Sequence, residues 1–281
     1  MKSLLAADKI FVREHFALFL RRARSLRLEA EVRPAYAVHF LLRGAVVLAG
    51  SVELNAPAVL LAAPADAVEA RGRDVEILTL TLAPAYLLDA AVRARLTRGD
   101  ARITFPSPTV SSDARLAQLA RDLASELRGA EAGHEIALDA LVEQAAIHLL
   151  RRHANISRSD ELELSRVGLV DRRVRRAVEL MHAQLDRDLP LEELASAAYL
   201  SPFHFARLFK KVAGASPHAY LAALRIERAQ NLLAASDASV TEIAARVGYS
   251  SPSHFTKAFR QSTGLTPRAF RAALVGADVR D

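Results

Sequence analysis

Two short segments of this chain repeat one another fifty residues apart. The first reads S-P-F-H-F-A-R-L-F-K-K-V-A-G from Ser201 to Gly214, and the second reads S-P-S-H-F-T-K-A-F-R-Q-S-T-G from Ser251 to Gly264. In each, aromatic and small apolar residues recur at the spacing of one helix face, and each opens with Ser-Pro, a pair favoured where helices begin. The repeat therefore predicts two similar short helices that bury the same side.

Each repeat follows a second short helical pattern and a tight turn. These upstream stretches read L-E-E-L-A-S-A-A-Y-L and V-T-E-I-A-A-R-V-G-Y-S, and the second turn is one residue longer. Two helices separated by a few residues form a helix-turn-helix, predicted here at 191–213 and 239–263. Helical repeat arrays usually need three or more units, so two copies joined by a long helix disfavour a plain scaffold.

The predicted outer faces of the two repeated helices carry cations and no acid. The residues opposite the buried stripe are Phe203, His204, Arg207, Lys210 and Lys211 in the first copy, and Ser253, His254, Lys257, Arg260 and Gln261 in the second. From Asp171 onward, 16 Lys and Arg stand against 11 Asp and Glu, so most of the net charge of +6 lies in this part. Such a surface favours a polyanionic partner.

The helix between the two motifs sets a distance that matches DNA. About 18 residues of helix span roughly 27 Å, which is close to the roughly 34 Å between successive major grooves on one face of a duplex. One chain would then contact two adjacent grooves. The copies agree on the buried side and differ on the outer side, as expected if each reads a different half-site.

The segment from about Val174 to Leu274 resembles the AraC/XylS family of bacterial transcription regulators. The resemblance is carried by L-E-E-L-A, S-P-F-H-F-A-R-L-F-K-K, R-I-E-R-A-Q-N-L-L, V-T-E-I-A-A-R-V-G-Y, S-H-F-T-K-A-F-R and G-L-T-P-R-A-F-R, in this order. It implies a bipartite DNA-binding domain, placed at 171–275, in which the second helix of each pair enters the major groove of double-stranded DNA.

The resemblance also implies roles for individual residues. The base-facing positions would be Phe203, Ala206 and Arg207 in the first motif and Ser253, Thr256 and Lys257 in the second. Arginine makes bidentate contacts to guanine, whereas Lys210, Lys211 and Arg260 are expected to meet phosphates. Two interpretations remain open for Phe203, a thymine-methyl contact or support of the turn. Two also remain for His204 and His254, a phosphate contact or the rim of the core.

The first 170 residues predict a different architecture, so the fold class is α+β. Residues 8–28 are predicted to form an amphipathic helix, with one face made by Phe11, His15, Phe16, Phe19 and Leu20. Short Val- and Leu-rich runs between residues 36 and 82 predict a small antiparallel barrel, which is similar to the cupin-like sensor of the family. The N-terminal helix and the barrel together form a predicted sensor domain at 1–112. A helical dimerisation hairpin follows at 113–153, and a polar linker at 154–170.

The predicted barrel has two open interpretations. In the first it binds a small effector, with Tyr36, His39 and Arg43 of the stretch Y-A-V-H-F-L-L-R-G as candidate contacts. In the second it is packed solid and serves only dimerisation. A cupin-type enzyme with an accessory DNA-binding module is the alternative to a regulator.

The residue inventory disfavours that enzyme. The chain has no cysteine, and His39 is the only histidine between His15 and His134, too few for a barrel-mouth metal centre. No nucleophile elbow or phosphate loop is present. We therefore predict no catalytic residue, metal or cofactor. No export signal or membrane span is evident, so we expect a cytoplasmic homodimer that contacts RNA polymerase if it activates.

Overall fold

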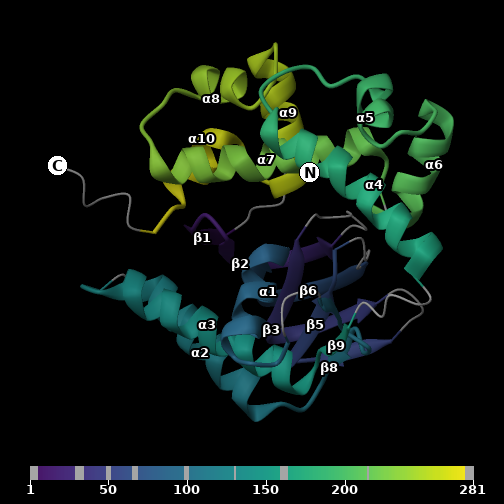
Figure 1. Ribbon diagram of the computed structural model, residues 1–281. Helices are drawn as coiled ribbons and strands as arrows, with labels where there is room; N and C mark the ends of the chain where they lie inside the picture. The colour runs from purple at the N-terminus through teal and green to yellow at the C-terminus, as the bar shows by residue number, and fades with distance from the viewer. Residues whose placement is uncertain are drawn as a thin grey trace. The chain divides into compact units, whose positions relative to one another are not determined.

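The computed structural model describes residues 6–28, 35–48, 52–64, 69–97, 101–129, 131–158, 164–213 and 215–275 (Figure 1). The chain divides into two compact units. Among the described residues, the first unit holds those up to Arg158 together with 273–275, and the second holds 164–272. No helix in the described part of the chain is long and apolar enough to cross a membrane.

The first unit is built on an antiparallel sheet. Its strands are β1 (Ala6–Val12), β2 (Phe16–Leu28), β3 (Tyr36–Leu48), β4 (Glu53–Asn55), β5 (Ala58–Ala62), β6 (Ala70–Leu82) and β8 (Thr109–Val110). They run in the order β1-β2-β6-β3-β5-β8, and β4 pairs with β3. A separate pair joins β7 (Ala101–Thr104) to β9 (Asn155–Arg158). The predicted strands between 36 and 82 are confirmed.

The helix predicted over residues 8–28 is wrong, because this segment forms the β1–β2 hairpin. Five consecutive residues of β2, from Phe16 to Leu20, are buried. A strand covered on both faces loses the simple alternation of apolar and polar residues, and its apolar run then imitates helical spacing. His15, assigned to the buried helix face, lies in the hairpin loop with its side chain 56% exposed.

The sheet does not close into the predicted barrel. Closure would require the edge strand β1 to pair with β8, which is only two residues long. Instead, Ile10 of β1 binds residues near the chain end: its N–H donates to the Ala273 carbonyl at 2.9 Å, and its own carbonyl accepts from Val275 N–H at 2.7 Å. Ile10 and Leu274 form a parallel bridge. Main-chain pairing thus occupies the edge that a barrel would use.

Three helices pack on one face of this sheet. They are α1 (Pro84–Arg93), which the sequence analysis did not predict, α2 (Ala114–Gly129) and α3 (His134–Arg152) (Figure 1). Their buried leucines and alanines join Phe11, Phe40 and Leu80 of the strands in one core. The helices predicted at 113–128 and up to 153 are confirmed. Asp113 caps α2 as expected: one carboxylate oxygen accepts the N–H groups of Arg115 and Leu116 at 3.0 Å.

The polar segment predicted as a linker at 154–170 is structured at both ends. Residues Asn155–Arg158 form β9, whose Ile156 stands opposite Ile103 of β7 and packs against the main core. Helix α4 begins at Leu164. The stretch N-I-S-R has one apolar side chain. That side chain anchors an edge strand by packing on the core, but one residue gives no alternating pattern by which a strand could be predicted.

The second unit is helical throughout its described residues. Its helices are α4 (Leu164–Ala183), α5 (Leu191–Ala197), α6 (Pro202–Ala213), α7 (Pro217–Ala235), α8 (Val240–Arg246), α9 (Pro252–Thr263) and α10 (Pro267–Ala272). The pairs α5–α6 and α8–α9 are the two predicted helix-turn-helix motifs, and their turns occupy 198–201 and 247–251. The turn that was predicted to be one residue longer in the second copy is confirmed.

Each of the two motifs has its own aromatic core, and the two cores have the same arrangement. In the first, the rings of Phe205 and Phe209 lie 5.4 Å apart, and Tyr220 meets Phe209 edge-on at 5.3 Å. In the second, Phe255, Phe259 and Phe270 repeat this arrangement, with 5.6 Å and 5.2 Å between centroids. All the phenylalanines are fully buried. Edge-to-face packing of this kind adds about 0.5–1.5 kcal/mol per pair beyond burial.

Arg225 of the connecting helix α7 joins the loops of both motifs. Its guanidinium donates to the carbonyls of Leu185 and Arg187, at 3.0 and 2.7 Å, in the loop before α5. It also lies 5.7 Å from the centre of the Tyr249 ring, in the turn of the second motif. Gly248 of that turn has φ +80°, and a Cβ there would lie 2.4 Å from the Leu185 carbonyl oxygen. The two motifs are therefore fastened at one junction.

Glu76 of β6 ties the end of α2 to the sheet. One of its carboxylate oxygens accepts from Arg22 of β2 at 2.7 Å and from Arg128 of α2 at 2.8 Å. The Glu76 side chain is only 10% exposed. Burial acts to raise the pKa of Glu76, but the two guanidinium groups outweigh it and lower the pKa below its ordinary value.

We predict that Glu76→Gln lowers the free energy of unfolding of the first unit by about 1–3 kcal/mol at pH 7, because two guanidiniums lose a charged acceptor. Since the pKa is lowered in the folded state, this stabilisation is present above the unfolded value of about 4.3 and is lost as the pH falls through the folded one. Denaturant unfolding from pH 7 to 3 should show wild type and variant converging. Glu53→Gln, at an exposed position of β4, is the control. A constant difference down to pH 3 would contradict the assignment.

We predict that Gly248→Ala destabilises the second unit by at least about 2 kcal/mol, through both backbone strain and the clash with the Leu185 carbonyl. Gly133→Ala is the matched control, because Gly133 has a similar φ of +83° but no atom within 4 Å of an added Cβ. The excess cost at Gly248, measured by chemical unfolding, isolates the close approach of the two loops. Equal costs would mean that the loops tolerate a wider separation.

Candidate nucleic-acid interface

Helices α6 and α9 expose the same positions. From Phe203 to Lys210 and from Ser253 to Arg260, equivalent residues have the same class of exposure, with the aromatic pair of each helix buried. Because both helices pack through that pair, the side opposite faces solvent. The predicted outer faces therefore lie where the sequence analysis expected them.

The exposed face of α6 combines an aromatic ring with cations. Phe203, His204, Arg207 and Lys210 are exposed, and Ala206 is half-buried. Phe203 is 76% exposed and touches only the edge of His204 among the ring contacts of the described residues. Its exposure does not fit a role in supporting the turn. The side chain of Lys211 lies outside the described residues.

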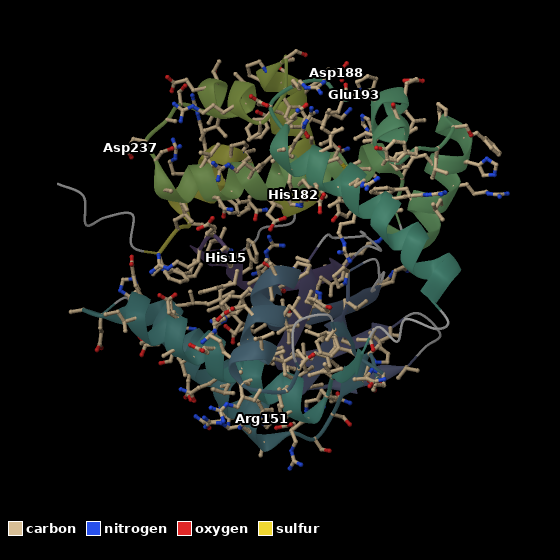
Figure 2. The ribbon with its side chains drawn as sticks, viewed as in Figure 1. His15, Arg151, His182, Asp188, Glu193 and Asp237 are labelled. Atoms are coloured by element: carbon tan, nitrogen blue, oxygen red, sulfur yellow. The ribbon has the colours of Figure 1, made fainter. Side chains whose placement is uncertain are left out.

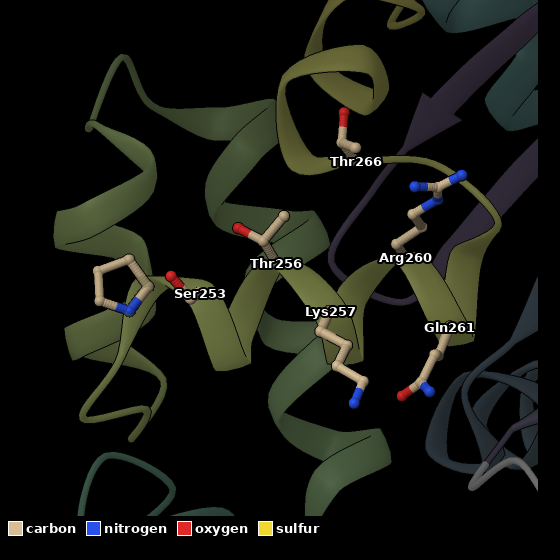
Figure 3. Close-up of a pocket in the computed structure, with 7 residues that line it drawn as sticks. Ser253, Thr256, Lys257, Arg260, Gln261 and Thr266 are labelled. Carbon is tan, nitrogen blue, oxygen red and sulfur yellow. The ribbon is translucent and has the colours of Figure 1, made fainter.

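The exposed face of α9 is more polar. Ser253, His254, Lys257 and Arg260 are exposed, and Thr256 is half-buried. Together with Pro252, Gln261 and Thr266, the residues Ser253, Thr256, Lys257 and Arg260 line a shallow groove of about 650 Å³. Figure 3 shows Ser253, Thr256, Lys257, Arg260 and Gln261 on α9, with Thr266 on the segment that precedes α10. Hydroxyl, amide and cationic groups of this kind contact both phosphates and base edges.

Both histidines stand at the helix starts. The backbone N–H of His204 donates to Ser201 Oγ at 3.4 Å, and that of His254 donates to Ser251 Oγ at 3.5 Å. Both imidazoles are exposed. The open N-terminal turn of a helix carries a partial positive charge, which favours an approaching phosphate.

Two further residues beside α6, Tyr199 and Arg176, had not been predicted from the sequence. Tyr199 lies in the turn of the first motif with φ +55° and is 74% exposed. The guanidinium of Arg176, from α4, lies 5.2 Å from the centre of its ring. An exposed aromatic residue in a left-handed conformation has no visible signal in the sequence, and Arg176 becomes a neighbour only through the fold.

Glu193 of α5 lies outside these faces and is paired. Glu193, in the first turn of α5, accepts from Arg187 at 2.9 Å; its side chain is labelled in Figure 2. The hydrogen bond from Arg187 lowers the pKa of Glu193 below its ordinary value. The sequences of α6 and α9 contain no Asp or Glu. The cations on their outer faces therefore have no acidic neighbour within the same helix.

The three predicted effector contacts do not share one site. The hydroxyl of Tyr36 donates to the Ile103 carbonyl at 2.8 Å, and its ring belongs to the main core. His39 is buried against Thr79, with its Nδ1 2.9 Å from the hydroxyl oxygen. It projects from the face of β3 opposite to Tyr36, because side chains alternate along a strand. Arg43 is exposed.

A cavity of about 150 Å³ lies elsewhere in the first unit, between β3, β5 and α2. Most of its lining is apolar, with Asp113 and Arg121 as the charged members. The lining residues are Phe40, Leu41, Leu42, Ala56, Pro57, Ala58, Val59, Val110, Asp113, Ala117, Ala120 and Arg121. None of the three predicted effector contacts is among them.

Comparison with known proteins identifies the second unit. A family model described as a helix-turn-helix domain matches residues 194–273. Regulatory protein PocR of Salmonella typhimurium is 42% identical over 74 residues, which are 26% of this chain and 24% of PocR. The probable transcriptional regulator LumQ of Photobacterium leiognathi is 29% identical over 144 residues, 50% of this chain and 53% of LumQ. The matches thus span about a quarter to a half of these curated relatives.

A solved structure shares the fold over most of the chain. ToxT from Vibrio cholerae aligns with a TM-score of 0.61 over 94% of this chain and 100% of that one, at 11% identity. This likeness concerns the fold alone. The curated relatives are regulators, which agrees with the predicted regulator and not with the alternative of a cupin-type enzyme. With its family match and its regulatory relatives, the segment 194–273 is a helix-turn-helix domain of the AraC/XylS type of transcription regulators.

Proposed function

We propose that this protein regulates transcription in the cytoplasm by binding double-stranded DNA, with α6 and α9 in two successive major grooves. The observation that carries the proposal is the repeated motif itself. The two helices pack on matching aromatic cores, yet their exposed faces carry different cationic and polar side chains without an acid. Helix α7, with 19 residues, spans about 28 Å between them. That length suits neighbouring grooves.

The side chains divide into two roles in this proposal. Phe203, Ala206 and Arg207 of α6 meet base edges in one groove, and Ser253, Thr256 and Lys257 of α9 meet them in the next. Lys210, Lys211 and Arg260, further along the helices, bind phosphates, joined by His204 and His254 at the helix starts. Support comes from the exposure of Arg207, Lys210, Lys257 and Arg260 on the faces opposite the aromatic cores.

We further propose that the first unit dimerises through α2 and α3 and responds to a small effector. Ile136 of α3 is 77% exposed, a large apolar side chain on the outside of the hairpin. We place the effector site in the 150 Å³ cavity beside α2, because Tyr36, His39 and Arg43 do not share one site. One ToxT structure, 12% identical to this chain, is described as bound to an unsaturated fatty acid. A cavity of about 150 Å³ accommodates a much smaller apolar molecule, of roughly benzene size. An activating form would also contact RNA polymerase.

We predict that Arg207→Ala and Lys210→Ala weaken DNA binding in different ways. Genomic footprinting with the protein first supplies the operator. Arg207→Ala should then lower the preference for one base pair by about 1–3 kcal/mol and barely change binding to random duplex. Lys210→Ala should weaken both duplexes alike and reduce the salt slope by about 1.

Arg151→Ala controls for the loss of one exposed cation, because Arg151 lies in the first unit (Figure 2). Binding of all three variants is measured by fluorescence anisotropy at several salt concentrations. Equal losses on specific and random duplex for Arg207→Ala would refute its role in reading bases. Wild-type protein that fails to prefer any duplex would refute the proposed function as a whole.

We predict that Ile136→Glu converts a dimer of the full chain into a monomer, because a charge would be buried at the proposed contact. Sedimentation equilibrium measures the association constant. Val52→Glu is the matched control, since Val52 is also exposed, at 54%, but lies outside the hairpin. A monomeric wild-type chain, or a variant that dimerises as tightly as wild type, would overturn the assignment of the hairpin.

A further inference from the structure

Three possible metal ligands converge at the open end of the α2–α3 hairpin. The Nε2 atoms of His148 and His153 each lie 2.8 Å from the same oxygen, Oδ2 of Asp113. All three ligand atoms lie within 4.8 Å of one another. This is the one such group among the described residues, and it lies outside the DNA-facing helices.

The start of α2 holds the carboxylate in place. Oδ1 of Asp113 accepts the N–H groups of Arg115 and Leu116 as the helix cap. Oδ2 is thereby directed at the two imidazoles. Hydrogen bonds to the non-coordinating atoms of a ligand commonly fix its orientation in metal sites, and the capping bonds serve this purpose here.

The end of α3 brings the two rings together. In an uninterrupted helix, residues five apart point about 140° away from each other. His153 instead ends the helix, with φ −125° and ψ −12°, while its N–H still binds the Leu149 carbonyl. The rings of His148 and His153 consequently lie 5.9 Å apart on the same side as Asp113.

We infer that Asp113, His148 and His153 bind a Zn²⁺ ion. Two imidazole nitrogens and one carboxylate oxygen form a donor set that zinc prefers, with a fourth position for water. Their side chains are 15–22% exposed, so an ion has access and a water ligand has room. Zinc binds through the lone pair of each Nε2, so each neutral ring would carry its proton on Nδ1, and the two Nε2 atoms lie together beside Oδ2.

Zinc at this site would link the first turn of α2 to the last turn of α3. Asp113 also borders the 150 Å³ cavity between α2 and the sheet. An ion that binds only the folded state stabilises it, so zinc would hold the hairpin base and that wall of the cavity in one arrangement. The site acts within the first unit and does not depend on the proposed DNA contacts.

The test uses the full chain, stripped of metal by a chelator and titrated with zinc. We expect one zinc per chain by elemental analysis after dialysis, and a rise in the melting temperature of the order of 5 °C when zinc exceeds its dissociation constant about a hundredfold. His148→Gln and His153→Gln should each raise the dissociation constant for zinc at least about tenfold. Asp113→Asn should do the same while keeping the helix cap, because the asparagine oxygen also accepts from N–H groups.

His134→Gln is the matched control, since His134 begins the same helix α3 but lies outside the cluster. Cobalt added in place of zinc gives an independent optical signal for tetrahedral ligands. Circular dichroism of the metal-free variants confirms that they fold. The proposal is overturned if the wild type binds less than one zinc per chain at tens of micromolar free zinc, or if Asp113→Asn and both histidine variants bind as tightly as His134→Gln.

Discussion

Arg225 holds the second unit together at the point where its two halves meet. Its guanidinium binds the carbonyls of the loop before α5 and covers the Tyr249 ring in the turn of the second motif. Gly248 allows the Leu185 carbonyl to come close enough for this junction to form. Because both loops are fastened to one side chain of α7, the motifs cannot turn independently about that helix. In the proposed complex with DNA, this fixed geometry would lower the entropic cost of binding two grooves at once.

The aromatic trios explain why the two copies agree on one side only. Phe205, Phe209 and Tyr220 fill a small core in which every ring touches the next, and Phe255, Phe259 and Phe270 fill the other in the same way. Interiors packed this closely tolerate few changes of volume, so the buried positions are constrained. The exposed positions of α6 and α9 carry no such constraint. The chain is therefore free to place different contacts on an unchanged scaffold.

The sequence predicted the second unit well and the first unit only in part. The repeated stripes, serine caps and turns located α5, α6, α8 and α9, because their local signals and their packing agree. The β1–β2 hairpin was not predicted, because Phe16–Leu20 is buried on both faces and its unbroken apolar run resembles the spacing of a helix. Tertiary contacts invisible to local patterns account for the rest: the edge of β1 pairs with residues 273–275, and Ile156 anchors β9. At the candidate interface, exposed cations were predictable from helical spacing, whereas the stacking of Arg176 on Tyr199 and the clustering of Asp113, His148 and His153 arise only when distant segments meet.

The two exposed faces differ in chemistry, and this difference gives the proposed complex a direction on DNA. Helix α6 presents one guanidinium and an exposed ring, groups that suit guanine and the thymine methyl. Helix α9 presents no exposed phenylalanine; Lys257 and Arg260 stand there among hydroxyls and an amide around the groove, groups that suit polar base-edge, water-mediated and phosphate contacts. A single chain would therefore bind an asymmetric site, because exchanging the two grooves pairs each helix with the wrong half. If the chain dimerises, a symmetric operator would contain two such asymmetric sites, one for each chain. The two grooves bound by a single chain would still differ in sequence.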